Sequence, residues 1–175
     1  MRVKNLSKEK IIFIKRLIGL GSAVICLLLM LINFISYTSS STINSGAAIT
    51  WDDGLSLFSF LFNGSYEVLD SKASILRDIF TFSYVLGWIS FVLCVISIVV
   101  LLIGVIKKNN MITKIGSYIL LVSTLILVLS IFDRYESGNT VKYLNIFTWG
   151  YGLIVLVSAL GLVATITLDD KKENK

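Results

Sequence analysis

Four long apolar stretches dominate this 175-residue chain and constrain its fold more than any other feature. Each is long enough to cross the roughly 30 Å hydrocarbon core of a bilayer as an α-helix. Because 55% of the residues are hydrophobic and only 15% are charged, no sizeable soluble domain is left over. The sequence therefore predicts an all-α integral membrane protein, a bundle of four transmembrane helices at residues 17–37, 79–106, 115–132 and 146–168.

The charged residues are divided unequally between the two sides of these spans. Twelve of the sixteen Lys and Arg residues lie in the segments 1–16, 107–114 and 169–175. The loops 38–78 and 133–145 hold the other four, but seven of the eleven Asp and Glu residues. Because Lys and Arg favour the cytoplasmic side, the pattern predicts a multi-pass plasma-membrane protein with both termini in the cytoplasm. Trp and Tyr, which favour the membrane boundary, lie mostly in or beside the two outer loops.

The first apolar stretch has a second interpretation, a cleaved signal peptide. A basic segment precedes it, and Ser45, Gly46 and Ala47 resemble a processing site. However, its apolar run is longer than a typical signal core, and the small residues lie well past its end. We therefore expect the first span to be retained, with residues 1–16 as a basic cytoplasmic segment.

Small and weakly polar residues recur along each span at alternating spacings of three and four. Such spacing places them on one face of a helix, where small side chains let two backbones approach closely in a membrane. The sequence thus predicts a left-handed four-helix bundle; a conduit lined by hydroxyl groups is the alternative. The two cysteines are expected to pack in this seam, with a disulfide between them as the alternative. The predicted packing seam consists of Gly19, Ser22, Cys26, Asn33, Ser83, Gly87, Ser90, Cys94, Ser97, Gly104, Gly116, Ser123, Ser130, Ser158, Gly161 and Thr165.

The first outer loop contains a segment, residues 52–63, whose polar positions follow helical spacing. An aspartate can cap its start and Asn63 with Gly64 can end it, which predicts a short amphipathic helix. A strand is the competing prediction, because the segment is rich in β-forming residues. Its apolar surface is larger than a connector needs, so we expect it to bind a partner protein or, alternatively, lipid headgroups. The expected outer docking surface consists of Trp51, Asp52, Asp53, Phe58 and Phe62.

The chain lacks the residues that most catalytic and metal sites require. It has no histidine, and no carboxylate lies within a predicted span. Two glycine pairs, Gly19 with Gly21 and Gly150 with Gly152, both lack the flanking strand and helix of a nucleotide-binding loop. We therefore expect no enzyme activity, catalytic residue, metal, cofactor or nucleic-acid partner. Asn33, the strongest hydrogen-bonding side chain in a predicted span, is a candidate functional residue, but pairing with a serine on a neighbouring seam is the favoured interpretation.

Four spans with a larger first outer loop are similar in layout to the claudin and peripheral-myelin group. In that family a tryptophan in the outer loop precedes Gly-Leu-Trp and two cysteines. Here Trp51 is followed by Gly54 and Leu55, without the second tryptophan or either cysteine, so no family function is carried over. The remaining prediction is a non-enzymatic accessory, assembly or envelope-interaction subunit that contacts a membrane or envelope protein through its first outer loop. The alternative is a small transporter or a channel-forming homo-oligomer.

Overall fold

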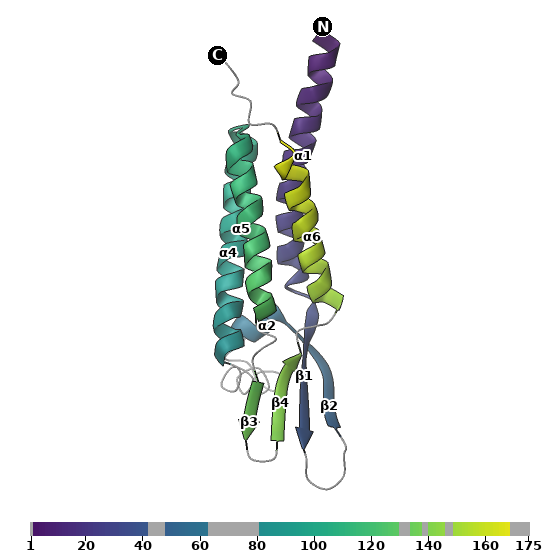
Figure 1. Cartoon of the computed structure of the whole chain (residues 1–175), viewed down its shortest axis with the longest axis vertical. Helices are drawn as coiled ribbons and strands as arrows, with labels where there is room; N and C mark the ends of the chain where they lie inside the picture. The colour runs from purple at the N-terminus through teal and green to yellow at the C-terminus, as the bar shows by residue number, and fades with distance from the viewer. Residues whose placement is uncertain are drawn as a thin grey trace.

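Four long helices pack side by side and alternate in direction. The computed structural model describes residues 2–41, 48–62, 81–129, 134–137, 140–145 and 149–168. Both chain ends lie at one end of the bundle, and a β-sheet stands beyond the other end (Figure 1). Helix α4 packs most extensively on α5, and α1 on α6. The helices are α1 (Arg2–Leu29), α4 (Thr81–Ile106), α5 (Asn110–Val128) and α6 (Trp149–Ile166).

Three of these helices are long and apolar enough to cross a membrane. They comprise residues Lys8–Leu29, Thr81–Ile106 and Asn110–Val128, while α6 contributes a shorter apolar helix, Gly150–Ile166. Their side chains that face away from the bundle are almost all large and apolar, including Leu28, which is 55% exposed. This composition is compatible with a helical bundle whose surface faces lipid. It confirms the prediction of apolar helices that can span a membrane.

Helix α1 differs from the prediction at both ends. It begins at Arg2, so the basic segment 1–16 is not separate but forms the first turns of the helix that enters the bundle. Lys, Arg and Glu are good helix formers, so the basic residues do not interrupt it. The helix ends at Leu29, and residues Asn33–Ser41, whose first part we expected inside the membrane, form strand β1. A short apolar run fits a strand as well as a helix, which is why the predicted boundary was wrong.

Strands from the two predicted outer loops, together with the end of the first predicted span, form one antiparallel sheet that the sequence analysis did not predict. Its strands are β1 (Asn33–Ser41), β2 (Ala48–Ser56), β3 (Arg134–Ser137) and β4 (Thr140–Asn145), in the order β2-β1-β4-β3. Thr38 of the central strand β1 pairs with Thr50 on one side and with Tyr143 on the other. The four long helices agree with the prediction, but the all-α prediction is wrong for the segments that form strands β1 to β4.

The predicted amphipathic helix at residues 52–63 is correct only for its second half. Residues Ala48–Ser56 form β2, and helix α2 covers only Leu57–Phe62. Asp52 and Asp53 therefore lie within a strand and cannot cap the helix. The β-forming residues before Ser56 gain ladder hydrogen bonds with β1, a tertiary contribution that helical spacing does not reveal.

The turn between α4 and α5 is shorter than the predicted loop 107–114. The amide of Asn109 donates to the Gly104 carbonyl, and that of Lys108 donates to the Val105 carbonyl, which together close α4 as a Schellman motif. Lys108 takes the left-handed conformation that this motif requires, with φ of 51°. The Asn109 side chain then accepts a hydrogen bond from the Ile112 amide and caps the start of α5. One helix thus ends and the next begins within three residues.

Arg16 of α1 fastens this turn to the rest of the bundle. Its guanidinium donates to the carbonyl oxygen of Lys108 and, through Nε and Nη2 at 3.0 and 2.7 Å, to Oδ1 of Asn110. The side chain is only 6% exposed. Lys108 lies in the turn that follows α4, and Asn110 is the first residue of α5. Arg16 therefore links α1 to both α4 and α5, at the end of the bundle that carries the chain termini.

Candidate functional site

The predicted seam residues of α4 and α6 lie in the interior of the bundle. On α4 the buried residues are Ser83, Leu86, Gly87, Ser90, Cys94, Ser97, Leu101 and Gly104. On α6 the residues Ser158, Gly161 and Thr165 are all buried. Gly19, Ser22 and Cys26 of α1 and Gly116 and Ser123 of α5 are buried too. The interior therefore consists largely of small and hydroxyl-bearing side chains.

Glycine allows the helices to touch at the backbone. A Cβ atom on Gly161 of α6 would lie 2.0 Å from Ser22 Oγ of α1, and one on Gly19 would lie 2.7 Å from Thr165 Cγ2. In the other helix pair, a Cβ on Gly104 would lie 2.9 Å from the backbone nitrogen of Thr113. These approaches leave no room for a larger side chain, so the two helices of each pair are in close backbone contact at these levels.

Hydroxyl groups connect the helices where the glycines do not. Ser90 Oγ donates to the Ser123 carbonyl at 2.8 Å, and Ser123 Oγ donates to the Ser90 carbonyl at 2.7 Å, which gives α4 and α5 a reciprocal pair. Tyr151 Oη of α6 donates to the Thr124 carbonyl of α5 at 2.7 Å. Because a buried hydroxyl in hydrocarbon needs a partner, these bonds account for much of the polar seam as packing. Sequence reasoning missed Thr124 and Ser117 of α5, which repeat the spacing one position away from the predicted stripe.

We expect the Ser90 and Ser123 hydroxyls each to stabilise the bundle. Single replacements by alanine should each weaken folding by roughly 0.6 kcal/mol, the contribution of one interhelical hydrogen bond in a membrane. The double replacement should lose about the sum, because both acceptors are backbone carbonyls that alanine retains. Reversible unfolding in detergent micelles measures this energy. The matched control is Ser117→Ala, because the Ser117 hydroxyl is buried without a hydrogen-bond partner among the described residues. This change should be neutral or stabilising, and a Ser117→Ala loss as large as that at Ser90 would contradict the assignment.

Four predicted seam residues need separate mention. Asn33 lies on strand β1, so its predicted place on the helical packing seam is wrong. Ser130 lies outside the described residues. Cys94 has its Sγ 4.0 Å from the Ala23 carbonyl, and Cys26 has its Sγ 3.5 Å from the Ile154 carbonyl. Both cysteines are free thiols, so the disulfide alternative is not present.

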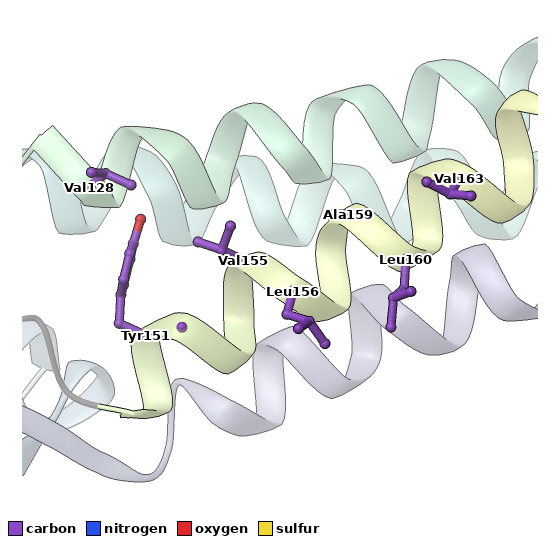
Figure 2. Close-up of a pocket in the computed structure, with 8 residues that line it drawn as sticks. Val128, Tyr151, Val155, Leu156, Ala159, Leu160 and Val163 are labelled. Atoms are coloured by element: carbon purple, nitrogen blue, oxygen red, sulfur yellow. The ribbon is translucent and has the colours of Figure 1, made fainter.

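A shallow groove of about 500 Å³ runs along α6 (Figure 2). Among the described lining residues only Tyr151 has a polar side-chain atom, and that hydroxyl donates to the Thr124 carbonyl. The described lining is therefore almost entirely apolar, which suits hydrocarbon. The lining residues are Val128, Tyr151, Gly152, Val155, Leu156, Ala159, Leu160 and Val163.

The structure divides the predicted outer docking surface between two elements. Trp51, Asp52 and Asp53 lie on strand β2, whereas Phe58 and Phe62 lie on helix α2. The two phenyl rings stack with centroids 4.5 Å apart, and each residue remains about 40% exposed. Sequence reasoning missed the inner face of α2, where Leu57, Phe60 and Leu61 are almost completely buried.

This inner face fixes α2 to the bundle. The Phe58 amide donates to the Met30 carbonyl at the end of α1. Leu57 and Leu61 approach Gly87 of α4 so closely that a Cβ there would lie 3.0 Å from Leu61 Cδ2. The Phe62 ring lies edge-on to Trp88 of α4, with centroids 4.7 Å apart. The exposed phenyl pair is thus held in a defined position beside α4.

Within the described ranges, no group of three or more His, Cys, Asp or Glu side chains is arranged to hold a metal ion. The chain matches no family model, no curated protein and no solved structure. The candidate site with the most distinctive geometry is therefore helix α2, which follows strand β2 directly and packs against α4.

Proposed function

We propose that this chain is a non-enzymatic integral plasma-membrane protein that acts as an accessory, assembly or envelope-interaction subunit through its outer end. The observation that carries the proposal is the clamped helix α2. Its buried face holds it against α4, while Phe58 and Phe62 remain exposed as a stacked pair. A connector between β2 and the next helix does not require such a rigid apolar surface.

The position of α2 along α4 also supports this function. Gly87, which α2 contacts, lies nineteen residues from the end of α4 at Ile106, a distance of about 28 Å along the helix axis. This equals the thickness of a hydrocarbon core, so the phenyl pair lies at the outer membrane boundary. Trp88 and Tyr84 lie at the same level, as expected for residues that favour an interface. A partner that crosses or rests on the membrane can reach this surface.

The proposal includes four spans, with α6 as the fourth, a left-handed bundle and both termini in the cytoplasm. Lys15, Lys107, Lys108 and Lys114 lie at the end of the bundle that carries the chain termini, which supports this orientation. The sheet then stands on the outer side, together with the phenyl pair. The lipid bilayer and a membrane or envelope protein are the proposed partners.

Replacing the stacked rings tests the docking role. Phe58→Ser combined with Phe62→Ser should reduce the recovery of co-purifying membrane proteins at least fivefold, because an interface loses most affinity when its exposed aromatic anchors are removed. The measurement is affinity purification in mild detergent with quantitative mass spectrometry. Phe82→Ser is the matched control, since Phe82 is a 50% exposed phenylalanine on α4. Unfolding temperatures recorded in parallel separate lost binding from lost folding.

Charge separates protein docking from lipid anchoring at this surface. Asp52→Asn combined with Asp53→Asn keeps the affinity for lipid and should still reduce partner recovery. If this variant and the serine variant both retain the complete set of partners and normal cellular activity, the proposed function is wrong and the surface only anchors the protein in lipid. Detergent-resistant homo-oligomers that conduct ions or solutes in liposomes would instead favour the channel alternative.

Labelling from outside the cell tests the orientation. A cysteine at Ser40 of β1 should react with an impermeant thiol reagent in intact cells, and a cysteine at Lys107 should react only after permeabilisation. The native Cys26 and Cys94 are first replaced by serine, which retains a small side chain in the seam. Reversed labelling of the two positions would show that the basic residues do not set the orientation.

A further inference from the structure

The end of the bundle that carries the chain termini is strongly basic (Figure 1). Segments 2–16 and 107–114 lie there and contain nine Lys and Arg residues against one acidic residue, Glu9. Residues 169–175 contain three acidic and three basic residues, so they add no net charge to this excess. An excess of positive charge at a membrane boundary attracts anions, and the most abundant anions at that boundary are the phosphates of lipids.

The α4–α5 turn presents two of these positive charges in a fixed position. Lys107 and Lys108 are both exposed, and they directly follow the last residue of α4. The backbone of the turn is closed by the Schellman motif and is held by Arg16, which donates to the Lys108 carbonyl. Only the two lysine side chains must therefore become ordered when a ligand binds, which keeps the entropic cost of binding small.

Large apolar side chains flank the two lysines. Ile106, the last residue of α4, is 70% exposed, and Met111, the second residue of α5, is 66% exposed. They are the most exposed of the large apolar side chains that the structure describes. Ile106 lies about 28 Å along α4 from Gly87, and therefore at the membrane boundary opposite the phenyl pair. The turn thus combines cationic and apolar side chains at the depth of the lipid headgroups.

The apolar flanks distinguish a lipid from other anions. A phosphate ion or an acidic segment of a soluble protein would pair with the lysines but leave Ile106 and Met111 in contact with water. An uncharged bilayer would cover the apolar side chains but supply no anion for Lys107 and Lys108. An anionic phospholipid satisfies both requirements, because its phosphate and the upper part of its acyl chains lie next to each other.

We infer that the α4–α5 turn binds an anionic phospholipid. Lys107 and Lys108 hold the phosphate, because lysine side chains at a helix end extend toward the headgroups. Ile106 and Met111 contact the upper part of the acyl chains. This site lies at the end of the bundle opposite α2, so it is separate from the proposed docking surface and does not depend on its role.

Lipid binding by the complete protein tests the inference. The protein is purified in an uncharged detergent and titrated with phosphatidylglycerol or phosphatidylcholine of the same chain length, and native mass spectrometry measures the bound fraction. Phosphatidylglycerol should bind at least tenfold more tightly. Lys107→Gln combined with Lys108→Gln should weaken its binding at least fivefold. Lys8→Gln combined with Lys10→Gln is the matched control, since it removes the same charge from exposed positions of α1, and it should weaken binding less than twofold.

The apolar contact has its own test. Ile106→Ser combined with Met111→Ser should weaken phosphatidylglycerol binding at least threefold, because the acyl chains lose their contact while both lysines remain. Unfolding temperatures recorded without added lipid verify that each variant is folded. Unchanged lipid binding by this serine variant would overturn the inference, because an apolar contact is what distinguishes a lipid site from a site for any anion.

Each of the following outcomes also overturns the inference. Equal binding of the two lipids excludes selection by charge. Equal losses in the two glutamine variants show a response to net charge and not a site at the turn. Displacement of the lipid by glycerol phosphate at equal concentration shows a site for phosphate ions, and displacement by a threonine–glutamate peptide shows a site for acidic protein segments. The proposed function is tested separately, because partner recovery that depends on Phe58 and Phe62 does not involve this turn.

Discussion

Replacing Gly161 by leucine should separate α1 from α6 and destabilise the bundle by at least ~3 kcal/mol, because overpacking of a closed core forces the backbone apart. A Cβ at this position would lie 2.0 Å from Ser22 Oγ and 2.8 Å from Ser22 Cβ. Rotation of the Ser22 side chain can move Oγ but not Cβ, which is fixed to the α1 backbone, so the two helices must move apart. The measurement is the free energy of unfolding in micelles, or the unfolding temperature where refolding is incomplete.

Two glycines that lack such contacts provide matched controls. Gly152 is on the same helix, and a Cβ there meets no atom within 4 Å; Gly21 has the same property on α1. Leucine at either position should leave stability unchanged or raise it slightly, since leucine has the higher helix propensity. Leucine at Gly19, where Thr165 Cγ2 lies 2.7 Å from the added carbon, should behave like the Gly161 variant. Equal stability losses at all four positions would show that glycine is needed for helix geometry and not for contact between helices.

The sequence was sufficient to locate the helix surfaces that face each other. Large apolar residues are equally stable against lipid and in the interior of a membrane protein, so they carry little information about packing. Small residues indicate which helix face is in contact with another helix, because only close backbone approach requires a small side chain. The spacing from Ser83 to Gly104 therefore predicts nearly the whole buried face that α4 has in the structure.

The outer sheet could not be predicted in the same way. Pairing between β1 and β4 joins segments about one hundred residues apart, and nothing in either segment identifies the other. Asn33 to Tyr37 continue the apolar pattern of α1, so hydropathy extends the helix into what is a strand. Residues 48–56 form a strand, but the polar positions from residue 52 onward follow helical spacing, so the sequence favoured a helix there.

Sequence patterns also miss side chains whose roles depend on a turn elsewhere in the chain. From the sequence, Arg16 was expected only to belong to the basic cytoplasmic segment 1–16. Its actual partners, Lys108 and Asn110, belong to a turn whose backbone is fixed by the left-handed conformation of Lys108. The acceptor is thus created by a Schellman motif, which cannot be related to Arg16 without the packed helices.

Among the described residues, Arg16 is the only charged side chain that is buried. Arg16→Ala should lower the free energy of unfolding by about 2–3 kcal/mol, because hydrogen bonds to a buried charged group contribute more than neutral ones. Arg16→Lys should recover only part of this stability, since an ammonium group lacks the fork that reaches two acceptors from Nε and Nη2. Asn110→Ala, which removes one acceptor, should show a smaller loss and little further loss when combined with Arg16→Ala.

Lys15 is the control that separates this contact from the effect of charge on orientation. It carries the same charge on the adjacent residue, and its Nζ donates at 2.9 Å to Thr167 Oγ1 at an exposed position. An exposed hydrogen bond contributes little, so Lys15→Ala should change stability by less than about 0.5 kcal/mol while removing the same positive charge. If the Lys15 and Arg16 variants lose equal stability, or if Asn110→Ala and Arg16→Ala are additive, then charge at the inner surface stabilises the protein and the three-helix contact does not.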